Sequence, residues 1–76
     1  MKERYYFTFL AQQLERVLNA DVGLEGLEIL MHGFVRKGGL SRETLRQRKR
    51  RDGEEWLAPY EAKLFSDYAG YDLISE

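Results

Sequence analysis

The sequence predicts a single, small, mainly helical domain of three to four helices. Three observations lead to this fold class. Apolar residues recur at spacings of three and four in several separate segments, glycine or asparagine follows each segment, and 76 residues allow one domain. We therefore expect residues 1–76 to form one all-α domain, in which residues 4–9 are either a short strand or an early start of the first helix.

The first helix is expected from about residue 7 to about residue 19. Its apolar positions are Phe7, Leu10, Leu14, Val17 and Leu18. The preceding Tyr5 and Tyr6 have the aromatic character that is typical of strands. Asn19 is expected to end this helix in a left-handed conformation, and Asp21 is expected to cap the next one.

A second amphipathic helix is expected between Gly23 and the pair Gly38-Gly39. Its apolar positions are Leu24, Leu27, Leu30, Met31, Phe34 and Val35. Glu28 and His32 fall on the opposite, polar side. We expect His32 to be a solvated side chain and not a catalytic base.

The third helix has the clearest start. Ser41 is a suitable N-cap, and Leu40 can pack against Leu45. After Leu45 the apolar pattern stops, because Arg48 and Lys49 occupy the places where a buried face would continue. We therefore expect this helix to project into solvent, residues 46–53 to be more mobile than the rest, and Arg48→Ala to change stability by less than about 0.5 kcal/mol.

The C-terminal segment, residues 52–76, is acidic and aromatic. Asp52 and Glu55 have the spacing of a capping box, which predicts a short turn that carries Trp56 and Leu57. Trp56 and Tyr71 lie outside the apolar pattern of the last helix. Because such residues are enriched at protein interfaces, both are candidates for one.

A fourth helix is expected over about residues 59–68. Pro59 suits the first helical position and Gly70 suits the end. Four apolar side chains recur at helical spacing and are expected in the core: Tyr60, Leu64, Phe65 and Tyr68.

Composition excludes several kinds of function. The chain has no cysteine, so it has neither a disulfide framework nor a thiolate metal site. It has one histidine and three serines, and no glycine-rich phosphate loop. We therefore expect no enzyme, no cofactor, no metal and no small-molecule substrate. Neither a transmembrane span nor a signal peptide is recognisable, so we expect a soluble, cytoplasmic protein without a membrane partner.

Charge is divided unevenly along the chain, although the net charge is −1. Residues 42–51 hold six basic side chains and one acidic one, whereas residues 52–76 hold one basic and seven acidic. Clustered cations favour nucleic acid, because they release counterions when they meet phosphates. The candidate nucleic-acid-binding residues are Arg42, Glu43, Arg46, Gln47, Arg48, Lys49, Arg50 and Arg51.

The order of a helix, a glycine turn and a capped helix over Met31 to Arg50 resembles a helix-turn-helix DNA-binding unit. Three residues fall where that unit has apolar side chains: Phe34, Leu40 and Leu45. Three others depart from its pattern: Val35, Gly38 and Arg48. The resemblance implies that the second helix enters the major groove, with residues 42, 43, 46 and 47 facing bases and residues 48–51 facing the backbone. It also implies a homodimer or a complex with a DNA-bound protein.

Three interpretations of the basic segment stay open. The first is a small regulator that contacts nucleic acid, DNA more readily than RNA, in transcription-type control. The second is a protein-binding modulator, such as a corepressor, adaptor or inhibitor, that meets an acidic protein surface and does not bind nucleic acid. The third is a solvated face that is neutralised by the acidic segment, with Asp52, Glu54, Glu55 and Glu61 as candidate partners.

Overall fold

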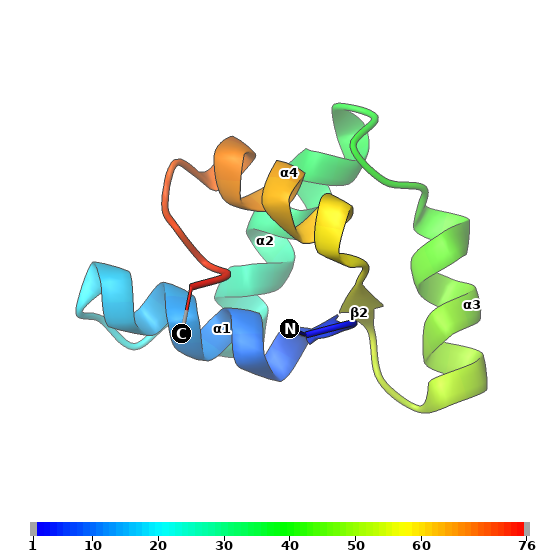
Figure 1. Ribbon diagram of the computed structural model, residues 1–76, viewed down its shortest axis with the longest axis horizontal. Helices are drawn as coiled ribbons and strands as arrows, with labels where there is room; N and C mark the ends of the chain where they lie inside the picture. Colours follow the sequence, from blue (N-terminus) through cyan, green and yellow to red (C-terminus); the bar gives the residue numbers. More distant parts are fainter. Residues whose placement is uncertain (1, 76) are drawn as a thin grey trace.

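The computed structural model describes residues 2–75, which form four helices and one two-stranded antiparallel sheet. The elements are, in chain order, β1 (Tyr5–Tyr6), α1 (Phe7–Leu18), α2 (Gly23–Arg36), α3 (Arg42–Asp52), β2 (Trp56–Leu57) and α4 (Pro59–Ala69). The predicted mainly helical class is confirmed, and a short strand precedes the first helix. Helices α1, α2 and α4 pack together, and α3 stands along one side of them (Figure 1).

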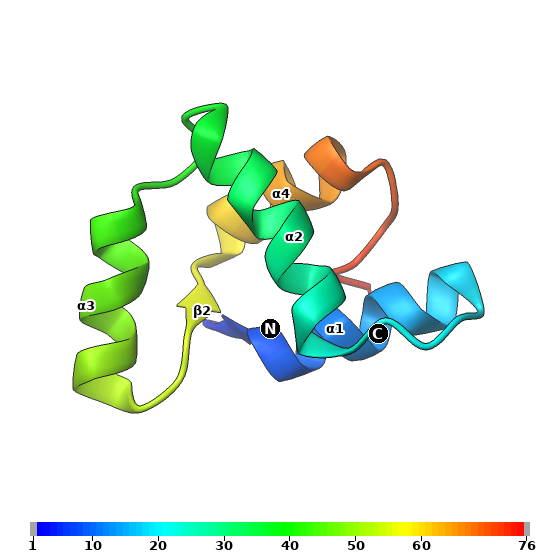
Figure 2. The ribbon, with the colours of Figure 1, turned by 180° about the vertical axis from the view of Figure 1, so that it is seen from behind.

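A single hydrophobic core joins α1, α2 and α4 to the two strands. Its completely buried large side chains are Leu10, Leu14, Leu27, Leu57, Phe65 and Leu73. From behind, Figure 2 shows α2 running diagonally between α4 and α1, and α2 contacts both of them. The rings of Phe34 and Phe65 meet edge to face with centroids 5.4 Å apart. Burial of one large apolar side chain stabilises a fold by about 1.5–3 kcal/mol relative to exposure. The completely buried residues named above therefore contribute much of the free energy that holds the helices together.

The small sheet joins the N-terminal segment to the chain that follows α3. Tyr5 pairs with Leu57 and Tyr6 pairs with Trp56, in antiparallel register. The expectation of a capping box that starts at Asp52 is wrong. Asp52 is the last residue of α3, and Gly53 ends the helix in the left-handed region at φ 82°. Residues 56 and 57 form a strand and not a turn, because β1 supplies hydrogen-bonding partners for them.

Two predictions concerned the connection from α1 to α2, and one of them is correct. Asn19 has the expected left-handed conformation, with φ 52°. Asp21, however, does not cap α2. The Glu15 carboxylate performs that role, since its Oε2 accepts from the backbone N–H groups of Val22 at 3.2 Å and of Gly23 at 2.8 Å.

Helix α4 begins at Pro59 and ends before Gly70, as predicted. Its expected buried stripe is only partly correct. Phe65 is completely buried, but Tyr60 is 68% exposed, and Leu64 and Tyr68 are exposed as well. The face that α4 turns to the rest of the molecule consists of Glu61, Ala62, Phe65 and Ser66, and Tyr68 borders it through ring contacts with Phe34 and Phe65.

The C-terminal tail returns to the core. The Ser66 hydroxyl donates to the carbonyl of Tyr71 and accepts from the backbone N–H of Leu73 at 2.9 Å, which places the Leu73 side chain in the core. The Gln13 side-chain amide donates to the carbonyl of Ser75. Within residues 2–75, no helix has both the length and the apolar character needed to cross a membrane.

Candidate nucleic-acid interface

Helix α3 starts as its sequence predicts. The Ser41 hydroxyl accepts hydrogen bonds from the backbone N–H groups of Glu43 at 3.1 Å and Thr44 at 3.4 Å. Leu40 and Leu45 are both buried and belong to the core. A cap of this kind contributes about 1 kcal/mol, so the first turn of α3 is firmly defined.

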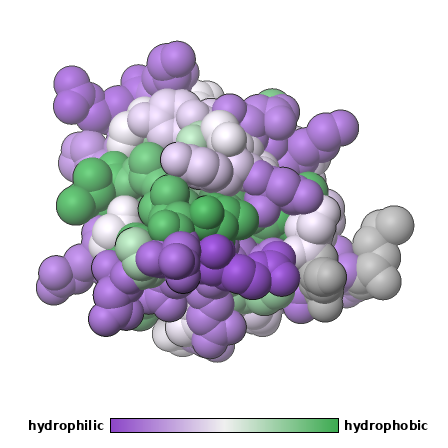
Figure 3. All heavy atoms as spheres, turned by 90° about the vertical axis from the view of Figure 1, so that its left-hand side faces the viewer, coloured by the Kyte–Doolittle hydropathy of each residue, from purple (hydrophilic) through white to green (hydrophobic). Residues whose placement is uncertain are grey.

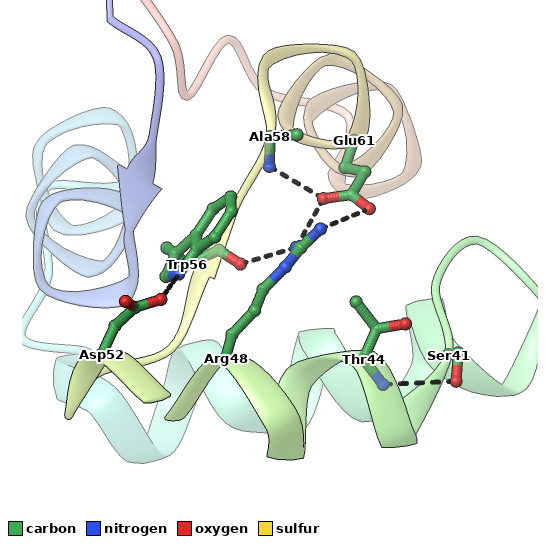
Figure 4. A network of polar contacts seen from close by, with 7 residues as sticks. All are labelled: Ser41, Thr44, Arg48, Asp52, Trp56, Ala58 and Glu61. Carbon is green, nitrogen blue, oxygen red and sulfur yellow. Dashed lines mark hydrogen bonds and ion pairs between the residues drawn. The ribbon is translucent and has the colours of Figure 1, made fainter. Parts of the chain in front are cut away.

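Arg48 is the main correction to the sequence analysis. We expected it to be exposed and to contact a nucleic-acid backbone, but its side chain is only 12% exposed. Its Nη1 donates to Oε1 of Glu61 at 2.7 Å and to the carbonyl of Trp56 at 3.0 Å, and its Nη2 donates to Oε2 of Glu61 at 3.2 Å. Figure 4 shows this guanidinium reaching from α3 across to α4. The ion pair is bidentate and largely excluded from solvent, so Arg48 has a structural role.

Glu61 is fixed from both sides. Its Oε1 also accepts from the backbone N–H of Ala58 at 2.8 Å, which satisfies a donor at the start of α4 (Figure 4). The Glu61 side chain is 5% exposed. The Glu61 carboxylate therefore has two structural roles: it caps α4, and it binds the arginine that attaches α3.

Trp56 is a second correction, because it is buried and is not an exposed interface residue. It is 9% exposed, and its Nε1 donates to Oδ2 of Asp52 at 2.9 Å. The guanidinium carbons of Arg4 and Arg48 lie 4.2 and 4.1 Å from the ring centroid. Tyr71, the other candidate, is exposed. The hydrogen bond from Trp56 and the nearby charge of Arg4 lower the pKa of Asp52 below its usual value.

These contacts attach one whole face of α3. Leu45, Arg48 and Asp52 follow one another at spacings of three and four, and each is held by a partner outside the helix or by the core. The expectation of an arm that projects freely into solvent is therefore wrong. Arginine takes the place that an apolar side chain would fill, because Glu61 neutralises it.

The opposite face of α3 is the outward face, which presents most of the predicted binding residues. Its exposed side chains are Arg42, Glu43, Arg46, Gln47, Arg50 and Arg51, and Lys49 is exposed at its border. Arg42, Arg46 and Arg50 are four residues apart, so they form a row with a rise of about 6 Å from one to the next.

Few of these cations are neutralised within the molecule. Arg46 pairs with Glu43 on its own helix at 2.7 Å, and Arg51 lies 3.8 Å from Asp52. Three further cations of α3 have no ion-pair partner within residues 2–75: Arg42, Lys49 and Arg50. Neutralisation by the acidic segment therefore applies to Arg48 and weakly to Arg51. It does not apply to the arginine row.

A groove of about 350 Å³ separates α3 from α2. Its floor includes Phe7, Met31 and Leu45, and its rim carries Arg42 and Lys49. The helix, turn and helix follow in the order of the unit that the sequence resembles. Helix α3 contacts β2, whereas its contacts with both α2 and α4 are sparse, and the Arg48–Glu61 ion pair joins it to α4.

Within residues 2–75, no group of three or more histidine, aspartate or glutamate side chains could hold a metal ion. His32 is exposed at the side of the groove. Comparison with protein families, with characterised proteins and with solved structures finds no match to this chain.

Proposed function

We propose that this protein is a small, non-enzymatic regulator that binds nucleic acid, DNA in preference to RNA, through the outward face of α3. The observation that carries the proposal is the exposed row of Arg42, Arg46 and Arg50 on a helix whose other face is fixed. Binding to phosphates gains affinity from counterion release and from a helix that is already held in position. A held helix loses less freedom on binding than a mobile arm would.

The row has dimensions that suit a polyanion. Three arginines over two steps of about 6 Å span about 12 Å, and phosphates of one DNA strand follow one another every 3.4 Å or so along the axis. Arg42 and Arg50 are unpaired among the described residues, so they need not break an intramolecular ion pair in order to bind. Gln47 lies beside the row and could meet base edges.

The test is the salt dependence of binding to fluorescently labelled DNA between about 50 and 200 mM salt. Arg42→Ala/Arg50→Ala should weaken binding and reduce the slope of log K against log salt by about 1.8 for duplex, since each lost phosphate contact removes about 0.9. The matched control is Arg36→Ala/Lys63→Ala, which removes the same charge from exposed residues outside α3. Equal losses in both variants, or no binding by the wild-type protein, would refute the proposal.

A protein-binding modulator is the second candidate, and exposed apolar side chains favour it. Tyr60, Leu64 and Tyr68 form an exposed stripe on α4. Figure 3, which faces the end of the molecule where α1 ends, shows a continuous apolar patch bordered by hydrophilic side chains. Exposed patches of this kind mark protein interaction sites in many proteins.

A pulldown from a nuclease-treated lysate of the cells that make the protein separates the two functions. A stoichiometric partner that is lost with Tyr60→Ser/Leu64→Ser and kept with Arg42→Ala/Arg50→Ala would support the modulator. A homodimer, or a complex with a larger DNA-bound protein, fits either candidate. Sedimentation of the purified protein tests for the homodimer, and the size of the complex recovered in the pulldown tests for a larger partner.

A further inference from the structure

We infer that the groove between α2 and α3 holds one unstacked nucleotide, with its base in the groove and its phosphate on the cations of α3. This inference rests on the proposed function and adds to it a preference for single-stranded over duplex DNA. Its basis is a groove of about 350 Å³ whose two walls carry opposite charge.

The α3 wall is cationic. Arg42, Arg46 and Lys49 line the groove, and Arg42 and Lys49 have no ion-pair partner in the part of the chain that the structure describes. Arg42 and Arg46 belong to the outward row as well. A strand that lies along the row therefore passes the mouth of the groove.

The facing wall is polar and anionic. Glu28 and His32 of α2 line it, together with Glu55 from the segment between α3 and β2. Carboxylates repel a phosphate, so an anionic ligand is oriented with its phosphate toward α3. They also accept hydrogen bonds from the exocyclic amino groups of cytosine and adenine. This polarity fits a nucleotide with an amino-bearing base.

The floor is apolar. Phe7, Met31 and Leu45 are each nearly buried, and Val35 lies beside them. Proteins bind single strands by combining a cationic path for the backbone with apolar or aromatic surfaces for the bases. In duplex DNA the bases are stacked and paired, so none can enter the groove without unpairing.

Two residue types that are rare in this chain allow a direct measurement on the wild-type protein. His32 is the only histidine, and Met31 is the only methionine besides Met1. We would titrate protein carrying ¹³C-methyl methionine with a 12-nucleotide single strand of mixed dA and dC, and separately with the duplex it forms with its complement. The single strand should shift the Met31 methyl and His32 ring signals and should bind about tenfold more tightly than the duplex.

A groove-filling variant tests the same point by affinity. Val35→Phe places a ring in the groove without changing charge, and should abolish the tenfold preference while duplex affinity stays within about twofold. Ile29→Phe is the matched control, because Ile29 lies on α2 outside this groove and is 75% exposed. If Val35→Phe does not fold, the shifts of the Met31 methyl and His32 ring signals in the wild-type protein test the inference by themselves.

The outcomes separate this inference from the proposed function. Salt-dependent binding of strand and duplex alike, with Met31 and His32 signals unmoved, would overturn the inference and leave the proposed function standing. Free AMP or CMP that moves the same signals, with no oligonucleotide binding, would support the groove as a site for free nucleotides and refute the proposed function. No response to any of these probes would overturn both.

Discussion

Nη1 of Arg48 lies 2.7 Å from Oε1 of Glu61, so the basic helix α3 is fastened to α4 by one of its own cations. Both side chains are almost withdrawn from solvent. An ion pair of this kind costs desolvation energy, and its main effect is to specify which helices meet and in what rotation. Here it turns the remaining cations of α3 outward.

Arg48→Ala should destabilise the protein by about 3–5 kcal/mol, because it leaves the Glu61 carboxylate buried without its partner. This replaces the small effect that the sequence analysis predicted. Urea denaturation measures the change. Arg50→Ala is the control on the same helix, and as an exposed substitution it should stay within about 0.5 kcal/mol of wild type. Equal stability of the two variants would show that the ion pair does not hold in solution.

Leu45→Ala should destabilise the protein by about 2–4 kcal/mol, since Leu45 is the apolar anchor of α3 and is buried. Hydrogen exchange should show faster exchange over α3 than over α1 in this variant. Ile29→Ala, at an exposed apolar residue, should leave the denaturation midpoint nearly unchanged. A loss at Leu45 no larger than that at Ile29 would contradict the packing described above.

Stability should depend on pH through Asp52. The pKa of this carboxyl is lower in the folded protein than its ordinary value of 3.8, chiefly because Trp56 donates a hydrogen bond to it. The folded state thus favours the ionised form, and this stabilisation is complete above the unfolded pKa and lost as pH falls through the folded pKa. The difference in Tm between wild type and Asp52→Asn should be constant above about pH 5 and should shrink below about pH 4. A difference that persists into strong acid would rule out the charge of Asp52 as its cause.

Ser66→Ala should destabilise the protein by about 1–3 kcal/mol, because it leaves the buried N–H of Leu73 without an acceptor. The C-terminal tail should then detach, and carboxypeptidase should remove it faster than from the wild-type protein. An unchanged digestion rate would mean that Leu73 holds the tail by burial alone.

Glu43→Gln should strengthen binding to DNA if the proposed function is correct. Nη1 of Arg46 lies 2.7 Å from Oε1 of Glu43 in an ion pair. Loss of the Glu43 charge removes this ion pair, so the Arg46 guanidinium becomes available to a phosphate. The slope of log K against log salt for duplex should steepen by about 0.9. Weaker binding would instead indicate that Glu43 itself contacts bases.

Local patterns predicted the helices well. The spacing of Leu10 and Leu14, the cap at Ser41, and the glycines after α2 and α4 are short-range signals, and each has its expected place. The exposed row of Arg42, Arg46 and Arg50 was predictable for the same reason, because helical spacing alone puts these residues on one face.

Long-range partners explain what the sequence did not predict. Arg48 appeared exposed because Glu61, which neutralises it, lies on another helix. Trp56 looked like a surface residue because the strand that pairs with it, β1, lies at the other end of the chain. The side of α4 that faces the core could not be deduced either, since Leu73 and Phe34 decide it from distant segments. In the sequence, the acidic segment 52–76 that follows the basic helix indicated an ion pair between the two segments. It did not indicate that Arg48 and Glu61 form this pair.

The pairing of β1 with β2 also sets the order of events during synthesis. Tyr5 and Tyr6 are synthesised about fifty residues before their partners Trp56 and Leu57. At ordinary translation rates this delay is roughly 3–10 seconds. During this delay the aromatic N-terminal segment has no strand to pair with, so its backbone hydrogen-bonding groups bind water instead. Completion of the sheet therefore waits for the synthesis of Trp56 and Leu57.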